Sequence, residues 1–296
     1  MNSSGGAWRG KLEPYLLILP AALFFLLVIA FPLGYNLAIS FLNWNASSRV
    51  KTLIWFKNYS DILGSNTFLT VLTNTVVWTV CGVAAQLLIG LLLAVLVNGV
   101  RRGQGALRSV FMLPWILPGV VVSLIWSWML QSDLGIINGL LRQTGLIDKP
   151  ILWLGDKNMA LFTVIAVNTW KAFPFWFITL LAGLQNVPGD QLEAAMIDGA
   201  NGFNLFVHIK VPHLMPVIST TGVMTTMWTL NYFDLIYIMT NGGPGWATST
   251  FPIYTYILAF QNYKYGKSAA MAILSLLLMA VLCIPYVRTV LRSQDN

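Results

Sequence analysis

The chain has 296 residues, of which 57% are hydrophobic and only 9% are charged, whereas roughly a quarter of the residues of an ordinary soluble domain are charged. This composition excludes most soluble folds. The formal net charge of +7 would suit a nucleic-acid-binding protein, but Lys and Arg occur singly or in pairs without the basic block that such proteins carry. The composition predicts a single transmembrane domain that covers residues 1–296.

Six apolar segments are long enough to cross a bilayer, which takes about 20 residues. The first is expected to be a retained helix rather than a cleaved signal peptide, because it is too long and lacks a small-residue cleavage pattern. Since lipid offers no hydrogen-bond partners to the backbone, all six are expected to be helices. The fold class is therefore predicted to be all-α integral membrane, with six transmembrane helices at about 15–42, 68–97, 108–130, 158–184, 213–240 and 268–290.

The orientation of these helices does not follow from charge. Cytoplasmic loops of membrane proteins carry an excess of Lys and Arg. If both termini are placed in the cytoplasm, the inner and outer segments carry equal numbers of these residues. The orientation has to come from another feature.

The loop of residues 186–212, between the fourth and fifth segments, is too long for a simple connector and contains helix signals. Asp190 and Glu193, three residues apart, fit a capping box at a helix start, and Gly199 permits a turn. We expect a short helix, a turn and a second short helix. Such a short pair cannot bury both of its faces alone, so the loop predicts a partner.

Glu193-Ala194-Ala195, Gly199 ten residues before Ile209, and Pro212 are characteristic positions in this loop. With them the loop resembles the signature loop of bacterial ABC importer permeases, and in particular of the carbohydrate branch typified by the maltose and glycerol-phosphate permeases. Val211 stands where that signature usually has leucine, which is a conservative change. The resemblance implies a type I ABC importer permease whose cytoplasmic coupling helix docks on an ATPase subunit. The residues that carry the resemblance, and are implied to couple to the ATPase, are Glu193, Ala194, Ala195, Asp198, Gly199, Phe206, Ile209 and Pro212.

The resemblance implies a permease subunit in the bacterial inner membrane with cytoplasmic N- and C-termini. It would move a carbohydrate, such as a di- or oligosaccharide, together with a second homologous permease, two ATPase subunits and an extracytoplasmic solute-binding protein. ATP and Mg would be bound by the ATPase subunits, so we expect no cofactor and no enzymatic activity in this chain.

An alternative from another class is a secondary transporter or channel that works without an ATPase. Such carriers usually have inverted repeats with broken helices, and acidic residues inside the membrane for ion coupling. The sequence indicates neither feature. We therefore expect the ATP-driven class.

A carbohydrate site needs amides or hydroxyls together with aromatic rings, because sugars present hydroxyl groups and weakly apolar ring faces. The fourth and fifth segments each place such residues along one helix face, and the resemblance to the maltose permease puts sugar contacts on these two helices. Ordinary helix packing is the alternative role for each residue. The candidate substrate-binding residues are Asn168, Ala172, Phe175, Thr225, Trp228, Thr229 and Tyr232.

Lys171 is the only formal charge deep inside a predicted helix, and charged residues in the membrane are costly unless they are paired or hydrated. One hypothesis is that Lys171 meets an acidic solute, such as a uronic-acid sugar or a phosphate ester. The other is that it faces a hydrated cavity or bonds to a carbonyl or carboxylate of a neighbouring helix. The sequence leaves both open.

Other motifs in the sequence predict no further chemistry. Gly266-Lys267-Ser268 contains part of a phosphate-binding loop, but no predicted strand precedes it and the upstream glycine is missing. His208 and His213 lack the Cys or Glu neighbours of a metal site. We expect no catalytic site and no bound metal.

Overall fold

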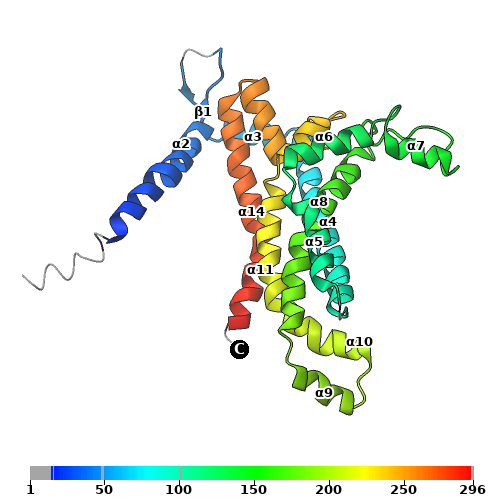
Figure 1. Cartoon of the computed structure of the whole chain (residues 1–296). Helices are drawn as coiled ribbons and strands as arrows, with labels where there is room; N and C mark the ends of the chain where they lie inside the picture. The colour runs from blue at the N-terminus through cyan, green and yellow to red at the C-terminus, as the bar shows by residue number, and fades with distance from the viewer. Residues whose placement is uncertain (1–14, 16, 48–49, 101, 295–296) are drawn as a thin grey trace, which may run out of the picture. The chain divides into compact units, whose positions relative to one another are not determined.

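The computed structural model describes residues 15, 17–47, 50–100 and 102–294, with side chains given up to Ile284 and at Arg288 (Figure 1). It divides into two compact units. The first comprises the chain up to Gly64 together with Thr255–Ile273, and the second comprises Ser65–Tyr254 and the chain from Leu274 onward. The predicted cytoplasmic termini include residues 1–14 and 295–296, which lie outside the described residues.

The first unit begins with a long helix, Leu17–Ser40. This helix contains the π-helical turn η1 (Leu26–Ala30) and ends with α2 (Phe31–Ser40). A two-stranded antiparallel hairpin follows, in which Leu42 of β1 pairs with Leu53 of β2. The other elements of this unit are β1 (Leu42–Asn43), β2 (Thr52–Leu53), α3 (Lys57–Leu63), η3 (Ile257–Gln261) and the first part of α14 (Tyr265–Gln294).

The second unit contains the helices that build the cavity described below. Its long helices α4 and α8 are side by side in Figure 1, and α9 and α10 lie beyond one end of α8. Its elements are α4 (Asn66–Asn98), α5 (Gln104–Ile116), α6 (Gly119–Met129), α7 (Ile136–Gln143), α8 (Ala160–Gln185), α9 (Gly189–Ile197), α10 (Gly202–Leu205), η2 (Phe206–Lys210), α11 (Val211–Leu230), α12 (Asp234–Thr240) and most of α13 (Phe251–Tyr256).

Small residues allow the helices of the second unit to approach closely, which is the usual basis of helix packing in membranes. A Cβ atom at Gly90 of α4 would lie 2.6 Å from Cβ of Trp176 and 2.9 Å from the backbone nitrogen of Phe177. A Cβ atom at Gly183 of α8 would lie 2.6 Å from a methyl carbon of Leu214. Trp176, Phe177 and Leu214 are buried in the apolar core between these helices.

The number of membrane spans remains a prediction. Among the described residues, four helices are long and apolar enough to cross a bilayer: Leu17–Ser40, Asn66–Asn98, Ala160–Gln185 and Tyr265–Ile284. The pair α5 and α6 qualifies only when taken together, as a fifth span that is broken. Helix α11, which covers the predicted fifth segment, is not among them, because its proline and threonine residues lower its hydropathy.

The predicted helix at 108–130 is not one continuous helix. The chain instead forms α5 and α6, which meet at an angle of 89°. Pro118 has no backbone N–H to donate, and the residue before a proline is disfavoured in the helical conformation. Leu117 accordingly adopts extended backbone angles, with φ −67° and ψ 134°.

The predicted helix at 213–240 is also divided, since α11 ends at Leu230 and α12 starts at Asp234. The end of α11 is held from α4. The indole Nε1 of Trp78 donates a hydrogen bond of 2.7 Å to the backbone carbonyl oxygen of Thr229, and both residues are buried. One of the carbonyl groups left over at the helix end is satisfied in this way.

The loop at 186–212 forms the predicted short helix and turn, but the capping box is wrong. Helix α9 starts at Gly189 with Pro188 as its N-cap, and no side chain caps it. Asp190 therefore lies in the first turn, where its negative charge interacts favourably with the positive end of the helix dipole. The second short helix, α10, does not end before Pro212, because it continues through the π-helical turn η2 into α11.

Candidate functional site

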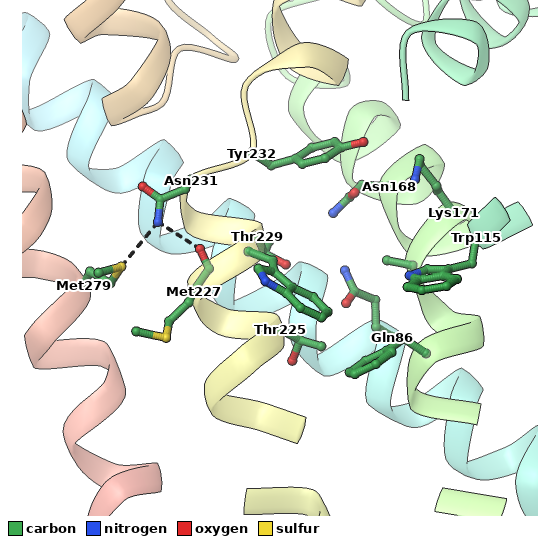
Figure 2. Close-up of a pocket in the computed structure, with 13 residues that line it drawn as sticks. Gln86, Trp115, Asn168, Lys171, Thr225, Met227, Thr229, Asn231, Tyr232 and Met279 are labelled. Atoms are coloured by element: carbon green, nitrogen blue, oxygen red, sulfur yellow. Dashed lines mark hydrogen bonds between the residues drawn. The ribbon is translucent and has the colours of Figure 1, made fainter. Parts of the chain in front are cut away.

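A cavity of 660 Å³ lies in the second unit between α4, α5, α8, α11 and α14. Figure 2 shows its lining side chains converging on one space from the helices around it. All seven candidate substrate-binding residues are among the thirteen that line the cavity. The structure thus brings the two predicted helix faces together, and their contact with a solute stays a prediction.

Three aromatic rings form a row along the cavity. The ring centroids of Trp115 and Phe175 are 6.1 Å apart with nearly parallel planes, and those of Phe175 and Trp228 are 5.0 Å apart in an edge-to-face arrangement. These are the geometries that aromatic pairs prefer. Trp228 keeps 48% of its surface exposed although it sits in the row. The row therefore offers an open apolar face that could cover a ring of a bound molecule.

Two carboxamides face the same space. Asn168 on α8 and Gln86 on α4 are both buried and both line the cavity. Figure 2 shows both amide groups pointing into the space between the helices. Neither atom of the Gln86 amide has a hydrogen-bond partner among the described residues. A buried polar group without a partner destabilises the folded state by about 1–3 kcal/mol. A ligand that hydrogen-bonds to the Gln86 amide would remove this cost.

The two helix breaks meet beside the cavity. Tyr232 lies in the break between α11 and α12, and a Cβ atom at Gly119, the first residue of α6, would lie 2.8 Å from its hydroxyl oxygen. Trp115 lies just before the break between α5 and α6. Broken helices beside a cavity are common at the binding sites of transporters. The expectation that the chain has no broken helices was therefore wrong.

Lys171 also lines the cavity, on the face of α8 that carries Asn168 and Phe175. Among the described residues the only ion pair joins Lys267 to Asp61 in the first unit, so no carboxylate neutralises Lys171. The structure thus gives no support to a carboxylate partner on a neighbouring helix. A hydrated cavity, a carbonyl of a neighbouring helix and an acidic solute are the remaining explanations for this charge.

Five residues that line the cavity were missed by the sequence-based hypothesis. Gln86 had a recognisable signal, because it is the only glutamine in the apolar run at 68–97 and polar residues are rare in such runs. The others are apolar or lie at helix ends, where the sequence carries no such signal. The missed residues are Gln86, Trp115, Met227, Asn231 and Met279.

The candidate coupling residues lie in α9, in the turn after it, in η2 and at the start of α11. No residue of α9, α10 or η2 is buried. Ile197 is 87% exposed and Phe203 is 72% exposed. Gly199 has a φ of +86°, the left-handed conformation that favours glycine. The loop therefore presents an apolar surface that this chain leaves uncovered.

The Gly-Lys-Ser motif serves packing in the first unit. It follows irregular chain rather than a strand and begins α14. Lys267 Nζ lies 2.8 Å from Asp61 Oδ2, and the hydroxyl of Ser268 donates a 2.9 Å hydrogen bond to the carbonyl of Thr255. Both groups that would hold a phosphate are thus already engaged.

Comparisons with known proteins place these features in one family. The family described as "Binding-protein-dependent transport system inner membrane component" matches residues 86–289. The trehalose/maltose transport system permease protein MalF of Thermococcus litoralis is 33% identical over 277 residues, which cover 93% of this chain and 92% of that one. The diacetylchitobiose uptake system permease protein DasB of Streptomyces coelicolor is 30% identical, over 97% of this chain and 89% of its own.

A solved structure shares the fold. It is a crystal structure of a bacterial ABC transporter involved in the import of the acidic polysaccharide alginate, with a TM-score of 0.82 at 21% identity, covering 98% of this chain and 99% of that chain. The helical architecture is accordingly that of the ABC importer permeases. The chain belongs to the family of inner membrane components of binding-protein-dependent transport systems.

Proposed function

We propose that this chain is the permease subunit of an ATP-driven importer that moves a carbohydrate across the bacterial inner membrane. The single observation that carries the proposal is the cavity, in which an aromatic row faces two buried carboxamides. Apolar rings suit the faces of a sugar, and amides suit its hydroxyl groups. The names of the two permease relatives, which refer to trehalose/maltose and to diacetylchitobiose, support the same class of solute.

The energy source in this proposal is a pair of ATPase subunits on the cytoplasmic side. The exposed apolar side chains of the α9–α10 loop, Ile197 and Phe203, would dock on such a subunit, with Gly199 shaping the turn between them. The loop would then be cytoplasmic, and with the six predicted spans both termini would be cytoplasmic as well. A second permease and an extracytoplasmic binding protein complete the transporter, and ATP and Mg are bound by the ATPase subunits rather than by this chain.

The mechanism is an equilibrium between an inward-open and an outward-open state. ATP and the loaded binding protein would each favour the outward-open state, since a ligand shifts such an equilibrium only through its different affinities for the two states. Motion of the α9–α10 loop would reach the cavity through α8 and α11, because the loop connects these two helices directly.

The alternative is a secondary transporter or channel without an ATPase. Broken helices no longer separate the two classes, since this chain has them. Two differences remain: secondary transporters usually have inverted repeats, which the sequence does not indicate, and ion coupling usually requires an acidic residue in the pathway. The residues that line the cavity include a lysine but no aspartate or glutamate, which favours the ATP-driven class.

The test is reconstitution of this chain with its partner permease, ATPase subunits and binding protein in proteoliposomes. Uptake of radiolabelled maltose, trehalose and diacetylchitobiose is measured with ATP, without ATP and without the ATPase subunits. We expect uptake of at least one sugar only when ATP and the ATPase are both present. Uptake that continues without the ATPase would refute the proposal, and so would failure of the chain to co-purify with an ATPase.

A further inference from the structure

Gln86 of α4 has a side chain that the fold does not use. Its relative exposure is 0%, and neither Oε1 nor Nε2 has a hydrogen-bond partner among the described residues. Polar side chains buried between membrane helices normally hydrogen-bond across to a neighbouring helix. Gln86 is one of the residues that line the cavity, and it makes no such bond.

The backbone around Gln86 is held in place on both sides, one helical turn away in each direction. At Gly82 an added Cβ would lie 3.6 Å from the Thr229 side chain of α11 and 3.9 Å from Gln86 Nε2. At Gly90 an added Cβ would meet the backbone of α8. These contacts pack α4 against both of the helices that carry the predicted solute contacts. Gln86 therefore projects from a fixed position between them.

The amide of Gln86 is directed into the cavity rather than along the helix surface. Figure 2 shows it in the space between α8 and α11, below the amide of Asn168 in this view. A carboxamide presents one acceptor oxygen and one donor nitrogen side by side. Two neighbouring hydroxyl groups of a sugar offer the complementary pair, with one hydroxyl donating to Oε1 and the other accepting from Nε2.

We propose that Gln86 is a solute-binding residue that determines specificity by holding a pair of adjacent hydroxyl groups. This inference rests on the proposed carbohydrate function and adds a third helix, α4, to the two that were predicted to touch the solute. A site built around a buried amide discriminates strongly against a solute that lacks the matching hydroxyl, because the amide is then left unpaired. The aromatic row selects for a sugar ring in general, whereas Gln86 would select among sugars.

The chain offers a matched control on the same helix. Thr79 is also buried on α4, and its hydroxyl oxygen also lacks a partner among the described residues. It lines a separate cavity, mostly apolar, whose walls include Val83 and Trp176. If unpaired groups on α4 were only imperfect packing, removing either one should have the same effect on transport.

The experiment compares Gln86→Leu with Thr79→Val in the reconstituted transporter, using whichever of maltose, trehalose and diacetylchitobiose the wild type takes up fastest. We expect Gln86→Leu to lower kcat/KM for uptake by tenfold or more, and Thr79→Val to stay within twofold of the wild type. Both variants should unfold at or above the wild-type temperature, because each loses an unpaired buried polar group. A loss of transport without a loss of stability is a result that a structural role would not give.

Monodeoxy analogues of the same sugar provide the second measurement. For the wild type, removing one of the two hydroxyl groups that Gln86 holds should lower kcat/KM by tenfold or more, while Gln86→Leu should not distinguish that analogue from the parent sugar. Wild-type kinetics in Gln86→Leu, or equal losses in Gln86→Leu and Thr79→Val, would overturn the assignment while leaving the proposed function intact. Failure of the wild type to take up any of the three sugars would count against both.

Discussion

Replacing Trp228 by alanine tests the aromatic row of the cavity. Trp228 is 48% exposed, and a large aromatic side chain carries about 150–250 Å² of surface, so about 100 Å² of its ring is open. If a sugar ring covers half of that area, about 50 Å² leaves water on binding. At about 25 cal/mol per Å² this contributes about 1.3 kcal/mol, close to a tenfold change in affinity.

The assay is the concentration dependence of ATP-driven sugar uptake into proteoliposomes. Trp228→Ala should raise KM by roughly tenfold, a factor that follows from the area lost, whereas Trp228→Phe should keep most of the wild-type affinity because an aromatic face remains. Trp128→Ala is the matched control, since Trp128 lies on α6, is 74% exposed and does not line the cavity. A KM for Trp228→Ala within twofold of the wild type, or an equal rise in Trp128→Ala, would refute the role of the row.

Three further predictions concern the framework. Gly90→Ala should unfold at a lower temperature than Gly105→Ala, because only the first new methyl group meets a neighbouring helix, at a cost of about 1–3 kcal/mol; equal stabilities would contradict the close packing. Gly199→Ala should reduce ATP-driven uptake while Gly202→Ala does not, because only Gly199 has a positive φ; equal uptake would contradict a role for the turn. The ion pair with the α14 lysine lowers the pKa of Asp61 from its ordinary value of 3.8, so its stabilising effect is present above that pH and is lost as the pH falls through the lowered pKa. The difference in melting temperature between wild type and Asp61→Asn should therefore shrink below pH 3.8, and a constant difference would contradict the pairing.

The sequence predicted the long helices well because their signal is simple. The apolar runs that became α4 and α8 differ from the predicted 68–97 and 158–184 by only one or two residues at each end, since a bilayer-length run of apolar side chains permits little other than a helix. Asn168, Ala172 and Phe175, at i, i+4 and i+7 on α8, were expected to share a face, and all three line the same cavity. Their meeting with α11 in one cavity could be expected only from the family resemblance.

The breaks between α5 and α6 and between α11 and α12 could not be predicted from the amino-acid composition of these segments. Pro118 gave a warning of a kink, but an 89° bend depends on what α6 packs against, which is partly the α11–α12 region. The end of α11 has no proline at all. Its last turn instead accepts a hydrogen bond from Trp78, which lies 151 residues from Thr229 in the chain. Long-range contacts of this kind leave no mark on local hydropathy.

The role of Gln86 could not be predicted from the sequence either. A single glutamine in an apolar run could equally be a packing residue that bonds to a neighbouring helix. Only the three-dimensional structure shows that it makes no such bond among the described residues and that it lines the same cavity as Asn168. Its importance is therefore a property of the fold rather than of the residue type.

The central claim is that this cavity holds the transported sugar. The most direct measurement is a cryo-EM structure of the assembled transporter, trapped with vanadate during turnover in the presence of the sugar that it takes up fastest. We expect density for a sugar ring against Trp228 and Phe175, with hydroxyl groups within hydrogen-bond distance of Asn168. A sugar bound entirely to the partner permease, with this cavity empty, would contradict it.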